Sequence, residues 1–262
     1  LFSILLAVIL FTIFGKDNAI TTSEVVNSGI WSFETGLNLL FAALLQSFSY
    51  PFHDPVLTDR GFISSPKVTL KSFLWASVLG AICIVLFSII GVYAQSQGMQ
   101  GQAAVQVGKA FGTVILLVIN FIMITSAAST LDSTFSSFSK LLALDLNLGN
   151  TVKFGRWSMV AVAVLGTVPV FLDAEILSAT TISGTMVIGL TPVFLFWKGS
   201  APKISFHLSV FCGLLFGFLL IFNWFPDSLI FTTGKYANLL WINFWGILCC
   251  LFVYMIPTWI KK

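Results

Sequence analysis

The stretch of sequence that decides the fold is residues 114–142, VILLVINFIMITSAASTLDSTFSSFSKLL. Its first half is almost entirely apolar, and its second half carries hydroxyl side chains at positions 126, 129, 130, 133 and 137. Because this is the spacing of one face of an α-helix, we predict a helix with a stripe of hydroxyl groups. Asp132 lies beside the stripe, and an ionised aspartate in a membrane helix costs about 2.5–3.5 kcal/mol, so such residues mark ion or substrate paths. Hydroxyl and carboxylate oxygens bind hard cations, and the pattern therefore predicts a cation site on this helix.

The composition is that of a membrane protein. Hydrophobic residues make up 57% of the chain and charged residues only 9%, and the mean hydropathy is +0.98. Soluble domains carry about 25% charged residues, and a spanning helix needs about 20 mostly apolar ones. The sequence predicts a cut-off span at 1–14 and seven fuller spans at 31–53, 69–94, 112–143, 157–172, 175–198, 204–225 and 238–260. The span at 157–172 is short for a bilayer, so we expect it to extend at one end.

We expect an all-α, polytopic membrane helical bundle that forms a single transmembrane transporter domain over residues 1–262. Residue 1 stands in mid-span, which indicates the C-terminal part of a longer protein.

The basic residues predict the orientation of the spans. With the loop at 54–68 on the cytoplasmic side, ten lysines and arginines are cytoplasmic and three are not. The positive-inside rule then places this loop and the C-terminus in the cytoplasm of a multi-pass plasma-membrane protein. The ten are Arg60, Lys67, Lys71, Lys140, Lys153, Arg156, Lys198, Lys203, Lys261 and Lys262, and the three are Lys16, Lys109 and Lys235. The sequence has no basic patch with interleaved aromatic residues outside the spans, so we expect no nucleic-acid partner.

A second polar stretch is residues 46–60, QSFSYPFHDPVLTDR. Pro51 and Pro55 each remove a backbone donor and clash with the preceding turn, so we predict that this helix kinks or unwinds near its cytoplasmic half. Broken helices at membrane depth line cavities, and transporters use the freed backbone groups for binding. The alternative is a helix that proline simply terminates, with interfacial tyrosine and histidine.

Three segments follow one another in an order and spacing known from a family. The first to be considered is Ser126 to Ser139, followed by Leu144-Asp145-Leu146. The second lies earlier in the chain and consists of Tyr50 with Asp54 and Arg60. The third is Ile182-Ser183-Gly184-Thr185 with Pro192 and Phe196-Trp197-Lys198. They resemble, respectively, the sodium-site helix and the sixth and tenth core helices of the sodium:solute symporters, the sodium/glucose cotransporter-like family with a LeuT-type fold. The resemblance runs from about residue 30 to about residue 260.

The resemblance implies a fold and an ion site. The fold is the second inverted repeat of a LeuT-type transporter plus extra C-terminal helices, with the first core helix absent from the chain. In the family a sodium ion lies between the first and eighth core helices, which implies as ligands the Ser126 carbonyl and the hydroxyls of Ser129 and Thr130. Some members hold a second cation, and here the same helix offers Asp132 and Ser133. Asp132 departs from the usual hydroxyl, a change that strengthens this site or replaces the ion by a proton.

A solute site is implied as well. Tyr50 stands where sugar carriers of the family place a gating aromatic residue over the substrate. Sugar carriers have a lysine in the seventh core helix and a glutamine in the tenth, and this chain has neither, so sugar is disfavoured. We expect another small organic solute, such as a carboxylate, an amino acid or a vitamin. The candidate substrate-binding residues are Gln46, Ser49, Tyr50, Thr180 and Thr181.

The expected function is sodium-coupled symport of that solute across the lipid bilayer by alternating access, with sodium as the only metal and no cofactor. An ion channel, or another polytopic membrane protein with a cation-binding helix, is the alternative. The hydroxyl stripe also suits helix–helix packing through interhelical hydrogen bonds. We do not expect an enzyme, because Asp132 has no second intramembrane carboxylate, His53 has only local partners, and the sequence has no serine elbow or zinc motif.

Overall fold

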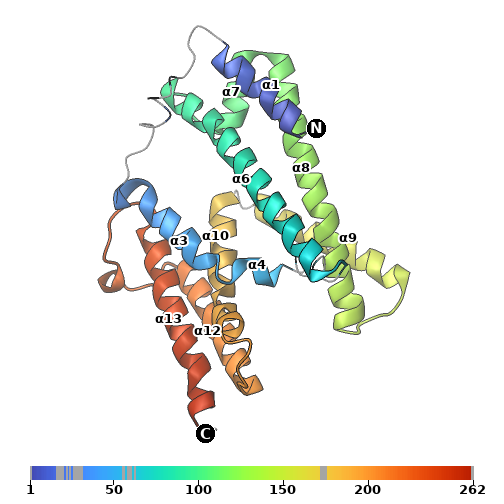
Figure 1. The fold of residues 1–262 in the computed structure, drawn as a ribbon, viewed down its shortest axis with the longest axis vertical. Helices are drawn as coiled ribbons and strands as arrows, with labels where there is room; N and C mark the ends of the chain where they lie inside the picture. Colours follow the sequence, from blue (N-terminus) through green and yellow to red (C-terminus); the bar gives the residue numbers. More distant parts are fainter. Residues whose placement is uncertain are drawn as a thin grey trace. The chain divides into compact units, whose positions relative to one another are not determined.

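The computed structural model describes residues 2–15, 21, 23, 25, 32–54, 57, 61, 63–171 and 176–260. All regular secondary structure in this part of the chain is helical, which confirms the all-α prediction (Figure 1). The elements are α1 (Phe2–Phe14), the π-helix η1 (Phe33–Leu37), α3 (Asn38–Gln46), α4 (Tyr50–His53), α6 (Pro66–Ser96), α7 (Ala103–Phe111), α8 (Thr113–Lys140), the π-helix η2 (Leu141–Asp145), α9 (Val152–Phe171), α10 (Ile176–Met186), the 3-10 helix η3 (Val187–Leu190), α11 (Thr191–Leu195), α12 (Lys203–Ile221), the 3-10 helix η4 (Asp227–Leu229) and α13 (Ala237–Ile260).

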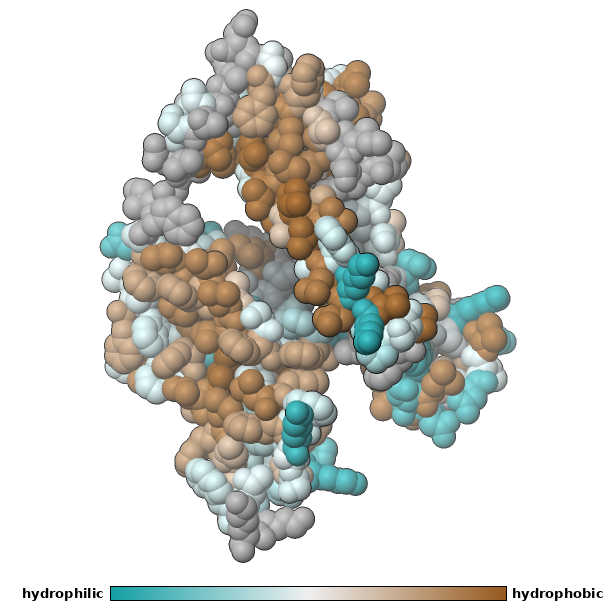
Figure 2. All heavy atoms as spheres, viewed as in Figure 1, coloured by the Kyte–Doolittle hydropathy of each residue, from teal (hydrophilic) through white to brown (hydrophobic). Residues whose placement is uncertain are grey.

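Four helices of the described chain are long and apolar enough to cross a membrane. They are α6, α8 continued by η2, α12 and α13, and each corresponds to one predicted span. Large apolar side chains remain exposed along them, as expected where lipid rather than water is the surrounding solvent. In Figure 2, apolar side chains cover most of the visible face of the helices around α13, and hydrophilic ones gather toward the end of that helix. Length and composition thus support a membrane-embedded helical protein.

Two predicted spans differ from the helices observed. Helix α9 starts at Val152, five residues before the predicted start of the span at 157–172. This confirms the expected extension at one end. The span at 175–198 is not one continuous helix, since the 3-10 turn η3 separates α10 from α11. Pro192 lies in the first turn of α11, where its missing N–H would have no helical partner in any case.

The predicted break in the 31–53 span is present, but it lies before Pro51. Helix α3 ends at Gln46, residues 47–49 form a turn, and α4 begins at Tyr50. Pro51 therefore sits in the first turn of the second piece, where proline is compatible with helix. Pro55 and Arg60 lie outside the described residues.

The chain divides into two compact units, Leu1–Ser28 with Arg60–Ala163, and Gly29–Asp59 with Val164–Lys262. The core of the first unit, hereafter unit 1, is formed by apolar residues of α1, α6, α7 and α8. Its fully buried side chains include Ile9, Ile90, Val107 and Ile119. The middle and second half of α8 lie outside this core, and most of their side chains are exposed.

The second unit, hereafter unit 2, is built on α12 packed against α13, α10 and η3. Small residues at four-residue spacing make one face of α12, and all of them are buried, namely Ser205, Ser209, Gly213 and Gly217. A Cβ atom added to Gly213 would lie 2.6 Å from the Gly189 nitrogen, so the two backbones are in direct contact. The Ser209 hydroxyl donates to the Gly189 carbonyl over 2.6 Å. Close backbone approach through small residues is how membrane helices associate, and it positions α10 against α13.

Candidate functional site

The predicted sodium ligands lie in the second half of α8. The Thr130 hydroxyl donates to the Ser126 carbonyl oxygen over 3.2 Å, so two of the three expected ligand oxygens are adjacent. The Ser133 hydroxyl donates to the Ser129 carbonyl over 3.2 Å in the same way. A carbonyl oxygen has a second lone pair, and a hydroxyl that donates one bond keeps its own lone pairs. These oxygens can therefore face a cation while their helical hydrogen bonds remain intact.

The hydroxyl stripe continues a face of α8 that is buried nearer its start. Ile119 and Ile122 are buried in the core of unit 1, and Ser126, Ser129 and Ser133 follow them at three- and four-residue spacing. Ser126 and Ser129 are exposed and Ser133 is half-buried, so the described residues leave the polar part of the face largely uncovered. The stripe therefore offers its oxygens outward from unit 1.

Asp132 is also exposed, next to the stripe. Within the described chain it makes no hydrogen bond or ion pair, which leaves its carboxylate oxygens available to a cation. The same part of the chain holds no group of three or more His, Cys, Asp or Glu side chains that could bind a metal ion. The oxygen ligands that this part of α8 provides for a cation are thus hydroxyls and carbonyls, with a single carboxylate.

Of the candidate solute residues, Gln46 enters a partly buried polar network in unit 2. Its amide nitrogen lies 3.1 Å from the Thr181 carbonyl, 3.3 Å from the Thr185 hydroxyl and 3.3 Å from the Asn243 side-chain oxygen. The Asn243 amide in turn donates to the Thr185 hydroxyl over 3.1 Å and to the Leu239 carbonyl over 2.7 Å. This network, formed by Gln46, Thr181, Thr185 and Asn243, ties together α3, α10 and α13.

A glycine makes room for this network. A Cβ atom added to Gly184 would lie 2.6 Å from Cδ of Gln46 and 2.9 Å from its amide nitrogen. The Gln46 side chain therefore lies flat against the backbone of α10, and only a glycine leaves that space.

The other candidate solute residues lie around the break and along α10. Ser49 is fully buried and its hydroxyl donates to the Gln46 carbonyl over 3.3 Å. Tyr50 is 40% exposed, with its ring edge-on to that of His53 at 4.6 Å between centroids. Thr180 is exposed, and its hydroxyl donates to the Leu177 carbonyl over 2.9 Å. The structure thus joins Gln46 to Thr181 and Ser49 to Gln46, while Tyr50 and Thr180 stand at the surface of unit 2.

A pocket of about 290 Å³ opens beside Thr181. It lies among α10, the end of α12 and the start of α13, and Lys235 and Asn238 also line it. Pockets of about 300 Å³ and more hold small ligands, so Thr181 connects the polar network to a space of suitable size.

Asn243 is not among the site residues predicted from the sequence, and Thr185 enters there only as part of a motif. Both side chains are fully buried, and they hold the network together. The signal was present in the sequence, because Asn243 is an amide inside the apolar span at 238–260. A polar side chain at membrane depth is a candidate site residue when its hydrogen-bond partner is known. The partner of Asn243, Thr185, becomes apparent only from the packing of α10 against α13.

The chain was compared with protein-family models, with curated proteins and with solved structures, and none of them matches it.

Proposed function

We propose that the chain belongs to a sodium-coupled symporter that moves a small organic solute by alternating access, with the second inverted repeat of a LeuT-type fold plus extra C-terminal helices. The observation that carries the proposal is the row of oxygens on α8. The Ser126 carbonyl and the Thr130 hydroxyl lie 3.2 Å apart on an uncovered polar face of a helix long enough to cross a membrane. Sodium is a hard cation and prefers such neutral oxygens, with carboxylate added where charge is needed.

Each oxygen has a distinct role in this proposal. The Ser126 carbonyl and the hydroxyls of Ser129 and Thr130 bind the sodium ion, and the remaining ligands come from another segment. Asp132 and Ser133 form a further cation position one turn along the helix. The broken helix α3–α4 and the network around Gln46, both in unit 2, line the solute path. The excess of lysine and arginine on alternate loops supports a cytoplasmic position of the 54–68 loop and the C-terminus.

Sodium binding by single-residue variants tests this assignment directly. Thr130→Ala and Ser129→Ala each remove one ligand oxygen while keeping a good helix former. An oxygen that contacts an ion contributes about as much as a charge-assisted hydrogen bond, about 1.5–3 kcal/mol, so the affinity for sodium should fall at least about tenfold. The measurement is the binding of radiolabelled sodium to the purified full-length protein, together with the sodium dependence of solute uptake in proteoliposomes.

Ser126→Ala is the matched control. Only the backbone carbonyl of residue 126 is assigned to the ion, so this variant should bind sodium like the native protein. A loss of affinity for Ser126→Ala equal to that for Thr130→Ala, or no loss for Ser129→Ala and Thr130→Ala, would overturn the ion site. Sodium currents through single molecules without coupled uptake would favour the channel instead.

A further inference from the structure

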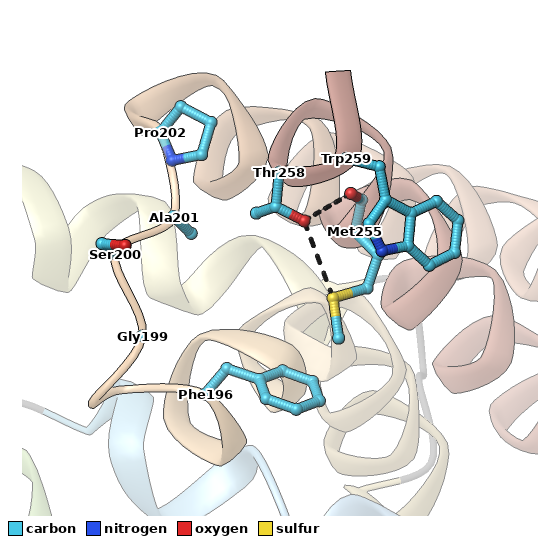
Figure 3. A pocket seen from close by; sticks show the side chains of 8 residues that line it. All are labelled: Phe196, Gly199, Ser200, Ala201, Pro202, Met255, Thr258 and Trp259. Carbon is cyan, nitrogen blue, oxygen red and sulfur yellow. Dashed lines mark hydrogen bonds between the residues drawn. The ribbon is translucent and has the colours of Figure 1, made fainter. Parts of the chain in front are cut away.

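One end of unit 2 carries a pocket that the proposed transport cycle does not use. It has a volume of about 580 Å³ and lies between the turn that connects α11 to α12 and the last turns of α13. Figure 3 shows Thr258, Met255 and Trp259 of α13 on one side and the turn with Gly199, Ser200, Ala201 and Pro202 on the other, with Phe196 below them. The start of α12 and the end of α13 therefore meet at the same end of the unit.

The lining of this pocket is amphipathic. Phe196 and Met255 supply apolar surface, and Trp259 adds an indole that is 62% exposed. The polar part consists of the Ser200 and Thr258 hydroxyls and the backbone of the turn. The Thr258 hydroxyl donates to the Met255 carbonyl, and the Met255 sulfur lies 3.9 Å from the Thr258 hydroxyl oxygen. A ligand for this pocket thus needs both a polar head and an apolar part.

In the sequence, lysines flank the segments that line this pocket, and acidic residues are almost absent from this part of the chain. Lys198 and Lys203 stand on either side of the lining turn, and the sequence continues after α13 with Lys261 and Lys262. From residue 176 to the end of the chain the sequence has a single acidic residue, Asp227. It lies in η4, between the end of α12 and the start of α13, and so at the opposite end of these helices.

An acidic residue of unit 2, Asp54, follows an element that packs against η3. Helix α4 contacts η3, and its Phe52 stacks on Phe194 of α11 at 4.1 Å between ring centroids. Asp54 follows this helix and is already engaged in an interaction. The segments that form the pocket, residues 196–203 and 255–260, thus carry Lys198 and Lys203 and no acidic residue.

The tryptophans place the pocket at the membrane surface. Trp197 and Trp259 are 71% and 62% exposed, and the Lys198 ammonium lies 5.2 Å from the centre of the Trp197 ring. Exposed tryptophan and lysine together at the ends of apolar helices mark the level of the lipid headgroups. In the proposed orientation this is the cytoplasmic leaflet, where anionic lipids are concentrated.

We infer that this pocket binds the phosphate headgroup of an anionic phospholipid. The phosphate lies near Lys198 and Lys203, and the glycerol and upper acyl chains lie against Phe196, Met255 and Trp259. Basic pockets between membrane helices on the cytoplasmic side suit such headgroups. A free phosphate ion would share the lysines but would leave most of the volume and the apolar surface unused. The inference does not depend on sodium symport.

The test measures lipid preference with the purified full-length protein. The protein is placed in nanodiscs of phosphatidylcholine containing a minority of phosphatidylglycerol, and quenching of tryptophan fluorescence by brominated phosphatidylglycerol is compared with quenching by brominated phosphatidylcholine. Each lysine near an anionic surface contributes about a fivefold gain in affinity, so Lys198→Gln combined with Lys203→Gln should weaken the affinity for phosphatidylglycerol about 25-fold. The affinity for phosphatidylcholine should stay the same.

Lys235→Gln is the control, because Lys235 is an exposed lysine of the same unit at the opposite end of α13. It should leave the preference for phosphatidylglycerol unchanged. The inference is overturned if the double variant keeps the native preference, or if Lys235→Gln loses as much of it, which would indicate general charge attraction. Displacement of the lipid by inorganic phosphate, but not by chloride at equal ionic strength, would assign the pocket to free phosphate instead.

Discussion

Gly213 is the position where a single methyl group should reveal how unit 2 is packed. A Cβ atom at this position would lie 2.6 Å from the Gly189 nitrogen, 2.9 Å from the Met186 carbonyl oxygen and 3.0 Å from the Gly189 Cα. All three neighbours are backbone atoms of α10 and η3, which cannot rotate away as a side chain can. Gly213→Ala must therefore push α12 away from this turn.

The size of the effect follows from these distances. Overpacking a tight contact costs about 1–3 kcal/mol, whereas alanine returns up to about 1 kcal/mol through its better helix propensity. Separation of the helices also lengthens the bond from the Ser209 hydroxyl to the Gly189 carbonyl, now 2.6 Å. A net loss of about 1–2 kcal/mol is a five- to thirtyfold drop in the ratio of folded to unfolded protein. At about 2–4 °C for each kcal/mol, Tm should fall by about 2–8 °C.

Thermal unfolding of the purified protein in one detergent, followed by loss of the monodisperse peak in size-exclusion chromatography, measures this change. Gly91→Ala in α6 is the matched control, since a Cβ atom there meets nothing within 4 Å. It should melt at or slightly above the native temperature. If Gly213→Ala and Gly91→Ala melt together, the close approach of α12 to η3 is wrong, and with it the account of how the Gln46 network is positioned.

The remaining predictions concern the solute path and the second cation position. Gly184→Ala should displace the Gln46 amide and raise the half-saturating solute concentration in uptake assays, with little change in the response to sodium; equal shifts in both would contradict a role in the solute path. Tyr50→Ala should likewise act on the solute more than on sodium, and a cysteine introduced at this position that no transported solute protects from labelling would argue against it. Asp132→Asn should weaken sodium binding, because the variant keeps the shape of the side chain but loses the negative charge beside the hydroxyl stripe. Asp132→Ser should remain a working symporter with altered ion coupling, and a sodium titration of Asp132→Asn that matches the native protein would remove the carboxylate from the ion site.

The sequence predicted those features that depend on local patterns. The span predicted at 238–260 is α13 (Ala237–Ile260), and that at 112–143 is α8 with η2, because apolar length alone determines where a helix can cross a membrane. The hydroxyl stripe from Ser126 to Ser137 follows from helical periodicity, since side chains three and four residues apart share a face. Proline in the 46–60 stretch indicated a break, and the break is the turn at 47–49, in the residues just before Pro51.

The identity of the polar partners was decided only by the tertiary structure. Gln46 and Asn243 are 197 residues apart, and nothing in either local sequence states that their side chains meet across α3 and α13. Gly184, Gly189 and Gly213 are ordinary helix residues in the sequence, and their role as contact points appears only when the backbones of α10, η3 and α12 approach. Lys198 and Lys203 are brought to the same end of unit 2 as the last turns of α13 by the antiparallel packing of α12 and α13. Hydropathy and periodicity act along one segment and can be read from it, whereas hydrogen-bond partners and close contacts depend on which faces of distant segments pack together.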